Sequence, residues 1–272
     1  MKNVTIAIIL IIIVVIGGII YSRTTKQDVT RNIDMISNGT TTDVVSSEVS
    51  YFDSARGWYA EPVEAGEYPG IIVIHEWWGL NEQIKEAAEE LARNGYKVLA
   101  VDLYEGKVAT SSDDARAFSG AIDQARATNN MKAAAQYLET RGITKIASLG
   151  WCFGGGQSLQ LSLSDLELDA TIIYYGRLAT ERNVLAEVDE PVLGIFGAED
   201  TSIPTTTVRQ FESTLDSLNI PNEIYIYPNV GHAFANPSGM NYSPEATMDA
   251  WEKTISFLDR NLKQATTTPV SI

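Results

Sequence analysis

The feature that most constrains this chain is a series of short, continuous apolar runs, each followed by a stretch of helical periodicity. Successive positions in these runs are apolar, so both faces of each strand should be buried, as in a parallel sheet with helices on both sides. The expected strands are GIIVIHE (70–76), YKVLAVDLY (96–104), KIASLGW (145–151), ATIIYYG (170–176), VLGIFGAED (192–200) and NEIYIYP (222–228). The pattern predicts an α/β fold, a three-layer sandwich with a mainly parallel central sheet flanked by helices.

The segments between these runs read as helices. In NEQIKEAAEELARNG, Ile84, Ala87, Ala88 and Leu91 share one face, and Gly95 is a typical C-terminal cap. The stretches VSYF and GWYAEP favour an opening antiparallel pair before the first buried strand. Further helices are expected at 112–141, 154–163, 203–219 and 243–263. In sheets of this kind ligands bind outside the carboxyl ends of the strands, so functional residues are expected there.

The domain organisation follows from composition. Residues 22–47 are rich in Ser, Thr, Asn and Asp and predict a flexible linker, residues 48–264 predict one α/β domain, and residues 265–272 predict a loose tail. The first 44 residues carry four Lys or Arg and three Asp or Glu, so the rest of the chain carries a net charge of −16. Such an acidic domain repels nucleic acid, and we expect no nucleic-acid partner.

The N-terminal segment 1–21 reads as a membrane anchor or a signal segment. An almost purely apolar run from Val4 to Tyr21 is just long enough to span a bilayer as a helix, and the residues after it fit a signal cleavage site poorly. The positions of Lys and Arg favour a cytoplasmic domain, whereas the Ser/Thr-rich linker is typical of an extracytoplasmic tether. We expect a single-pass anchor with the domain outside the cytoplasm; the alternative is a protein secreted after cleavage.

The only cysteine, Cys152, lies in GWCFGGG, directly after an expected strand and before an expected helix. This is a G-x-nucleophile-x-G elbow with Cys in the place of Ser. The turn brings the residues two before and two after the nucleophile close to neighbouring backbone, where glycine fits most easily. A helix N-terminus favours a thiolate, and the backbone N–H of Phe153 would face a developing oxyanion. The alternative is a small buried cysteine in a tight turn.

A thiol nucleophile needs a histidine base and a carboxylate that orients it. His232 lies in YPNVGHAF after the last strand, and Asp200 ends the strand VLGIFGAED. The order Cys152, Asp200, His232 is that of the nucleophile, acid and base in α/β-hydrolases. Glu199 and Asp189 are weaker candidates for the acid. Alternative interpretations are a loop histidine that binds backbone and an aspartate that caps a helix.

The loop after the first buried strand reads His75-Glu76-Trp77-Trp78. Folds of this class take a second oxyanion donor from this loop, and the backbone N–H of Trp77 is the choice here. Glu76 is a carboxylate in an aromatic setting at the mouth of the site, where it could accept the Cys152 proton. His75 is expected to be structural.

The chain resembles the dienelactone hydrolase family of α/β-hydrolases over roughly residues 48–262. The resemblance rests on IVIHEWWGLNEQIK, VLAVDLYEGK, GWCFGG, GAEDTSIP and YPNVGHAF, in that order. It implies a catalytic set of Cys152 as nucleophile, His232 as base and Asp200 as orienting acid, with Glu76 as the family glutamate that partners the resting thiol. It also implies that Trp77 and Phe153 supply the oxyanion hole.

Departures from that family shape the expected substrate. Enzymes that open dienelactones bind a substrate carboxylate with arginines, but Asn236 stands where one arginine is expected, and Glu105-Gly106-Lys107 again contains none. Lys107 could compensate, although a solvated loop lysine is the alternative. We therefore expect a hydrolase of small neutral esters or lactones. The expected pocket residues are aromatic: Trp78, Tyr104, Trp151 and Phe234, beside Trp77.

Two further functions remain open from the sequence. One is a thioesterase or another acyl-transfer enzyme, and the other is a membrane-tethered binding or scaffold protein that keeps the fold. One cysteine and two distant histidines do not form a zinc-ligand pattern, and we expect neither a metal nor an organic cofactor. The sequence does not indicate an oligomeric state.

Overall fold

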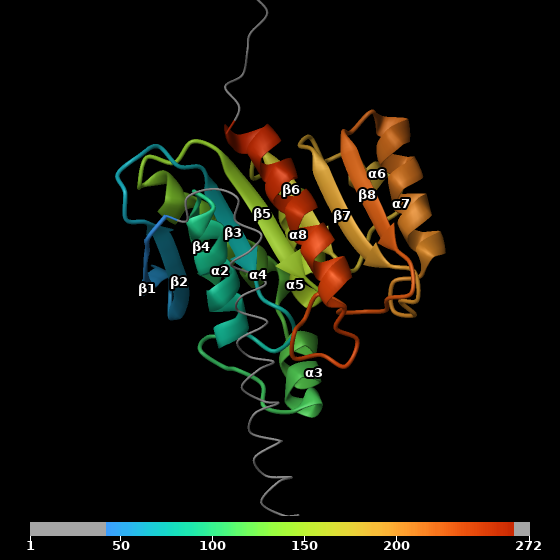
Figure 1. Ribbon diagram of the computed structural model, residues 1–272, viewed down its shortest axis with the longest axis horizontal. Helices are drawn as coiled ribbons and strands as arrows, with labels where there is room; N and C mark the ends of the chain where they lie inside the picture. Colours follow the sequence, from blue (N-terminus) through green and yellow to red (C-terminus); the bar gives the residue numbers. More distant parts are fainter. Residues whose placement is uncertain (1–41, 264–272) are drawn as a thin grey trace, which may run out of the picture. The chain divides into compact units, whose positions relative to one another are not determined.

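The computed structural model describes residues 42–263, which contain one eight-stranded sheet (Figure 1). The sheet order is β1-β2-β4-β3-β5-β6-β7-β8. From β4 to β8 all neighbouring strands are parallel, whereas β1 pairs with β2, and β2 with β4, in antiparallel fashion. The strands are β1 (Val44–Phe52), β2 (Ala55–Pro62), β3 (Gly70–Ile74), β4 (Lys97–Val101), β5 (Ile146–Trp151), β6 (Ala170–Tyr174), β7 (Val192–Gly197) and β8 (Asn222–Tyr227). The predicted fold class, with its opening antiparallel pair, is confirmed.

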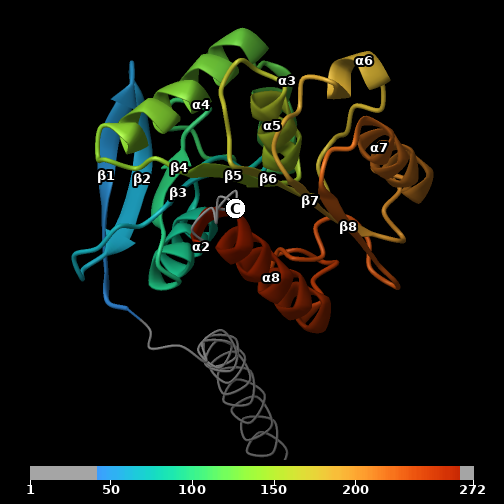
Figure 2. The same ribbon diagram turned by 90° about the horizontal axis from the view of Figure 1, so that it is seen from above.

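Helices cover both faces of the sheet, as Figure 2 shows from above. One face carries α2 (Glu82–Arg93) and α8 (Pro244–Leu258), which continues into a π-helical turn at Asp259–Lys263. The opposite face carries α3 (Ser112–Gly120), α4 (Gln124–Glu139), α5 (Phe153–Ser162), α6 (Arg182–Leu185) and α7 (Thr205–Leu218). The helical region expected at 112–141 is therefore two helices. The Asp123 side chain accepts from the N–H of Arg126 at 3.1 Å and starts the second one.

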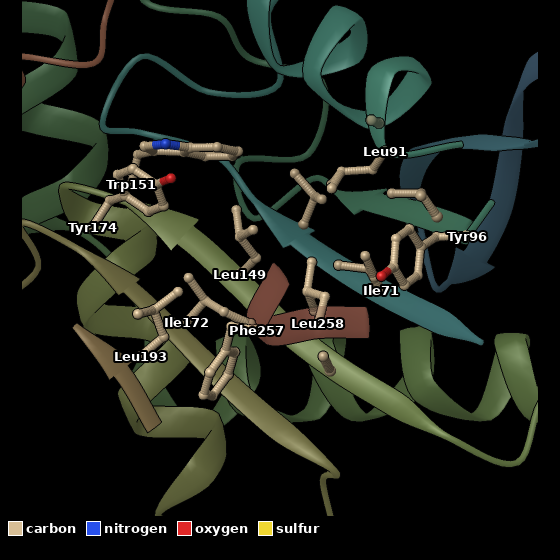
Figure 3. Close-up of a cluster of buried hydrophobic side chains, with 14 of the residues drawn as sticks. Ile71, Leu91, Tyr96, Leu149, Trp151, Ile172, Tyr174, Leu193, Phe257 and Leu258 are labelled. Atoms are coloured by element: carbon tan, nitrogen blue, oxygen red, sulfur yellow. The ribbon is translucent and has the colours of Figure 1, made fainter. Parts of the chain in front are cut away.

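The apolar runs are continuous because alternate side chains enter different core layers. Ile71 and Val73 of β3 belong to the cluster under α2 and α8, while Ile72 and Ile74 belong to the cluster under α4. Figure 3 shows the first cluster, where side chains of four parallel strands meet those of the two helices: Ile71, Leu149, Ile172, Leu193, Leu91, Phe257 and Leu258. Burial on both faces holds the strand ends in a fixed register, which positions the loops that follow them.

The ordered sheet begins earlier than expected, because β1 starts at Val44, inside the stretch predicted as linker. Residues 1–41 and 264–272 lie outside the described part, and so do the predicted segment 1–21, most of the linker and the predicted tail.

The prediction of a membrane anchor needs correction. Among the helices within residues 42–263, none combines the length and the apolar character needed to cross a bilayer. The expected span, Val4 to Tyr21, lies outside those residues. We therefore withdraw the anchor, the membrane partner and the membrane-bound localisation, and none of them enters the function argued below.

Candidate active site

Cys152 lies in a sharp turn between β5 and α5, with φ 55° and ψ −114°. Its N–H donates to the carbonyl of Tyr174 at 2.9 Å, which ties the turn to the end of β6. The flanking glycines are sterically required. A Cβ on Gly150 would lie 2.1 Å from the Gly154 oxygen, and one on Gly154 would lie 2.2 Å from the Ile74 oxygen. The steric reason predicted for the glycine spacing is thus confirmed.

Cys152, His232 and Asp200 form a continuous line of contacts, although 80 residues separate the first two in sequence. His232 Nε2 lies 3.1 Å from Cys152 Sγ, and His232 Nδ1 lies 2.7 Å from Asp200 Oδ2. The other oxygen of Asp200 accepts from the backbone N–H groups of Ser202 at 2.7 Å and Ile203 at 3.0 Å. The structure therefore brings together the three residues expected from the sequence.

These contacts change the pKa values of Asp200 and His232. Burial alone would raise the pKa of Asp200, but hydrogen bonds from His232 and from the Ile203 and Ser202 N–H groups lower it below its ordinary value. Burial alone would lower the pKa of His232, but its hydrogen bonds to Asp200 and Cys152 raise it to about 10. The arrangement therefore favours an imidazolium between two acceptors.

Glu76 is 3% exposed, and its Oε2 accepts from Asn236 Nδ2 at 2.5 Å. Asn236 is held in turn, because its Oδ1 accepts from the N–H of Ser238 at 2.8 Å. Burial raises the pKa of Glu76 to about 7, although Asn236 and His232 both act to lower it. The thiol of Cys152 is paired with His232, and the carboxyl of Glu76 is bound to Asn236. The pairing of glutamate with the resting thiol that the resemblance implies is therefore not the one found here.

His75 links two loops beneath the site. Its Nδ1 donates to the carbonyl of Glu76 at 2.6 Å, and its Nε2 accepts from the N–H of Leu103 at 3.2 Å. Burial lowers the pKa of His75 to about 4, which keeps the ring neutral. Both ring nitrogens are engaged with backbone, as the predicted structural role requires.

The two expected oxyanion donors lie on rigid backbone. Phe153 is the first residue of α5, where a helix leaves N–H groups without an intrahelical acceptor. The loop that holds Trp77 is pinned by the carbonyl of Trp78, which accepts from the N–H of Ala109 at 2.8 Å. Gly79 has φ +92°, and a Cβ there would lie 2.5 Å from the Lys107 oxygen.

The expected pocket aromatics lie in three different settings. Trp151 and Phe234 are 8% and 0% exposed and belong to the core cluster under α2 and α8. The rings of Trp77 and Trp78 meet edge to face at 5.1 Å, and both are part-exposed. Tyr104, whose ring lies 5.6 Å from the Phe153 ring in a tilted arrangement, lines a cavity of about 240 Å³. The other lining residues come mainly from the loop after β4 and from α3 and α4: Leu103, Glu105, Lys107, Phe118, Ala121, Ile122, Asp123, Arg126, Ala127 and Asn130.

Sequence reasoning missed two features of the site. In the sequence Asn236 stands only as the replacement of an expected arginine, and its bond to Glu76 is evident only in the fold. Tyr175, whose ring lies 5.3 Å from that of His232 in an edge-to-face arrangement, is not among the residues that the sequence predicts. Its position at a strand end, directly before Gly176, was the available signal.

The fold and the strand-end site together define an α/β-hydrolase. The dienelactone hydrolase family model matches residues 55–262, and the chain belongs to that family. The enzyme class expected from the sequence, a hydrolase that acts on ester bonds, is confirmed at this level.

Individual relatives agree with this assignment. A protein of Saccharolobus solfataricus named "Putative carboxymethylenebutenolidase" is 32% identical over 229 residues, covering 70% of this chain and 88% of the relative. A protein of Synechocystis sp. with the same name is 30% identical over 227 residues, covering 76% and 92%. The crystal structure of a "Putative Dienelactone Hydrolase" from Klebsiella pneumoniae aligns with a TM-score of 0.73 at 24% identity, covering 82% of this chain and all of that one. The last comparison supports the fold alone.

Proposed function

We propose that this protein hydrolyses small neutral esters or lactones through a thioester on Cys152. The observation that carries the proposal is the line of contacts from Sγ to His232 at 3.1 Å and from His232 to Asp200 at 2.7 Å. Such a chain of contacts keeps a proton on the histidine next to the nucleophile and holds the base in one orientation. The strained backbone of Cys152 presents the thiol at the carboxyl edge of the sheet.

The first half of the reaction forms the acyl-enzyme. The Cys152 thiolate attacks the ester carbonyl carbon, and the carbonyl electron pair moves to oxygen. The N–H groups of Trp77 and Phe153 donate hydrogen bonds to the resulting oxyanion. Such donors are commonly worth about 3–4 kcal/mol each. The intermediate collapses, the C–O bond of the alcohol breaks, and the His232 imidazolium gives its proton to the departing alkoxide. The products are an alcohol, a thioester on Sγ and a neutral imidazole.

The second half uses water. Neutral His232 takes a proton from a water molecule while the water oxygen attacks the thioester carbon. The C–S bond then breaks and releases the carboxylic acid. Cys152 returns to a thiolate and His232 to an imidazolium, so protons and electrons balance over the cycle. Asp200 keeps its charge throughout and orients the Nδ1–H of His232.

The proposal of a neutral substrate rests on how few cationic groups at the site are free to bind a substrate carboxylate. The Asn236 amide, at the position of an expected arginine, is bound to Glu76 and is 5% exposed. The ammonium of Lys107 lies 5.7 Å from the centre of the Phe118 ring. A substrate carboxylate would thus meet few free cations in a strongly acidic protein.

The test compares the purified full-length chain with two variants. We expect Cys152→Ala to reduce p-nitrophenyl acetate hydrolysis at least about a thousandfold, because the covalent step is lost. Cys152→Ser keeps a nucleophile of similar size and should retain part of the rate. Equal rates for the wild type and Cys152→Ala would refute the nucleophile. A large preference for a carboxylate-bearing dienelactone over neutral esters would refute the substrate class.

A further inference from the structure

A buried hydrogen bond joins the loop of the base to the loop of one expected oxyanion donor. The base loop is residues 228–243, after β8, and the oxyanion loop is residues 75–80, after β3. Asn236 of the base loop is 5% exposed, and its Nδ2 donates to Oε2 of Glu76 at 2.5 Å. Glu76 is 3% exposed and directly precedes Trp77. The reaction proposed above gives Asn236 no task.

On one side of this bond, Glu76 begins the turn that holds Trp77. The Gly79 N–H donates to the Glu76 carbonyl at 3.2 Å and closes the turn. His75 Nδ1 donates to the same carbonyl at 2.6 Å. A turn closed in this way leaves its central residues few free dihedral angles. The position of Glu76 therefore also sets the direction of the Trp77 N–H.

On the other side of the bond, Asn236 is fixed within the base loop. Its N–H donates to the carbonyl of Ala233 at 3.0 Å, and its Oδ1 accepts from the N–H of Ser238 at 2.8 Å. Ala233 directly follows His232. The amide is thus oriented by the loop of the base, and its nitrogen is directed to Glu76.

The link between Asn236 and Glu76 suits a permanent fastening. An amide N–H can donate to a carboxyl oxygen whether the carboxyl is ionised or protonated, so the link does not require one charge state of Glu76. Both side chains are buried, and removal of one partner leaves the other unsatisfied in a place that water reaches poorly. The two loops are therefore held together by more than shape.

The other expected oxyanion donor has separate support. Phe153 is the first residue of α5, and the elbow before it is held by the Cys152 N–H, which donates to the Tyr174 carbonyl at 2.9 Å. A displaced Trp77 N–H would leave the Phe153 donor in place. Removal of one such donor commonly slows an enzyme about a hundredfold to a thousandfold, and displacement should cost less.

We propose that Asn236 is a positioning residue that fastens the oxyanion loop to the base loop and keeps the Trp77 N–H aimed at the developing oxyanion. The inference rests on the proposed function, which takes Trp77 as a donor and Cys152 as the nucleophile. Asn236 acts through Glu76 and does not touch the substrate. Loss of the link weakens oxyanion stabilisation and leaves the Cys152 thiolate reactive.

Two reactions of Cys152 separate these effects. Attack on an ester creates an oxyanion, whereas iodoacetamide loses iodide from a tetrahedral carbon and creates none. The kcat/KM for p-nitrophenyl acetate and the second-order alkylation rate are measured at pH 8 for the wild type, Asn236→Ala and Asn236→Leu, of which the last keeps the side-chain volume. We expect both variants to lose kcat/KM at least about tenfold, with alkylation within about threefold of the wild type.

The matched control is Ser238→Ala, which removes a contact from the base loop to α2, between Ser238 Oγ and Gln83 Oε1 at 3.3 Å on the surface. Both rates of Ser238→Ala should stay within about twofold of the wild type. A double-mutant cycle tests the partner. In a Glu76→Ala background, Asn236→Ala should lower kcat/KM by no more than about threefold, because the link is already absent.

A parallel loss of both rates in the two Asn236 variants would overturn the proposal and assign Asn236 to the support of His232. An unchanged kcat/KM, or an equal loss with and without Glu76, would also overturn it. Loss of the cooperative urea transition in both variants would do the same, because the bond would then serve folding alone.

The proposed function fails on a different result. If Cys152→Ala hydrolyses esters at the wild-type rate, the proposed function is wrong, whatever the Asn236 variants show. If Cys152→Ala is inactive and both Asn236 variants keep the wild-type kcat/KM, only the present inference is wrong.

Discussion

Replacing Glu76 by Gln should change how the stability of this protein depends on pH. The carboxyl is 3% exposed, and burial raises its pKa from 4.5 to about 7. A raised pKa means that the folded state binds the proton more tightly than the unfolded chain does. The stability that Glu76 contributes is therefore fully present below pH 4.5 and is lost as the pH rises through about 7. Gln has nearly the same shape and can still accept from Asn236, but it does not titrate.

The magnitude follows from the two pKa values. Each unit is worth about 1.36 kcal/mol, so the whole window corresponds to about 3 kcal/mol. Between pH 5.5 and 8.5, the free energy of unfolding of Glu76→Gln should rise by about 2 kcal/mol relative to the wild type. This range stays above the isoelectric point of about 4.5, where the protein would tend to precipitate.

Urea unfolding at several pH values, followed by circular dichroism, measures the difference. The dependence of the unfolding free energy on urea concentration should be equal for both proteins, so that only the midpoint moves. Repeating the pair in a Cys152→Ala background keeps thiol titration out of the difference. Stability curves of wild type and Glu76→Gln that run parallel across this pH range would refute the view that Glu76 is held protonated by burial.

Two further predictions test the elbow and the base. Gly150→Ala places a Cβ 2.1 Å from the Gly154 oxygen, whereas a Cβ on Gly120 meets nothing within 4 Å. Calorimetry should show a thermal midpoint lower by about 10 °C or more for Gly150→Ala, and within about 3 °C of wild type for Gly120→Ala; equal midpoints would contradict the steric argument. Asp200→Asn should lower kcat about a hundredfold or more while the circular dichroism spectrum is retained, because His232 loses its orienting charge. A kcat that is unchanged would remove Asp200 from the triad.

Much of the fold could be predicted because its signals are local and repeated. Six apolar runs, each buried on both faces, leave few alternatives to a parallel sheet between two helical layers. The break between α3 and α4 was missed although it has two short local signals, Gly120 at the end of α3 and the capping side chain of Asp123 before α4. The early start of β1 was missed for a different reason: Val44 and Val45 are followed by three polar residues, without the alternation typical of a strand, and the edge strand is half exposed.

The candidate site also contains residues that could be predicted from the sequence and contacts that could not. Cys152, Asp200 and His232 could be predicted because each follows a recognisable strand, and the carboxyl ends of parallel strands meet at one edge of the sheet. The partner of Glu76 could not be predicted, since the contact with Asn236 joins two loops 160 residues apart and depends on their conformations. The hydroxyl of Tyr175, which has no hydrogen-bond partner among residues 42–263, could not be predicted either, because the sequence does not reveal which polar atoms lack partners.

The two carboxyl groups beside His232 are held in opposite states by their surroundings. Asp200 receives two backbone N–H groups and the imidazole, which stabilise its charge, whereas Glu76 receives one neutral amide in apolar surroundings. His232 therefore has one permanent counter-charge and one that depends on pH. Environments that separate the pKa values of neighbouring acids are how active sites assign different tasks to equal groups. On this reasoning Asp200 orients the base at every stage, and Glu76, held by Asn236, adjusts the charge that the imidazolium meets.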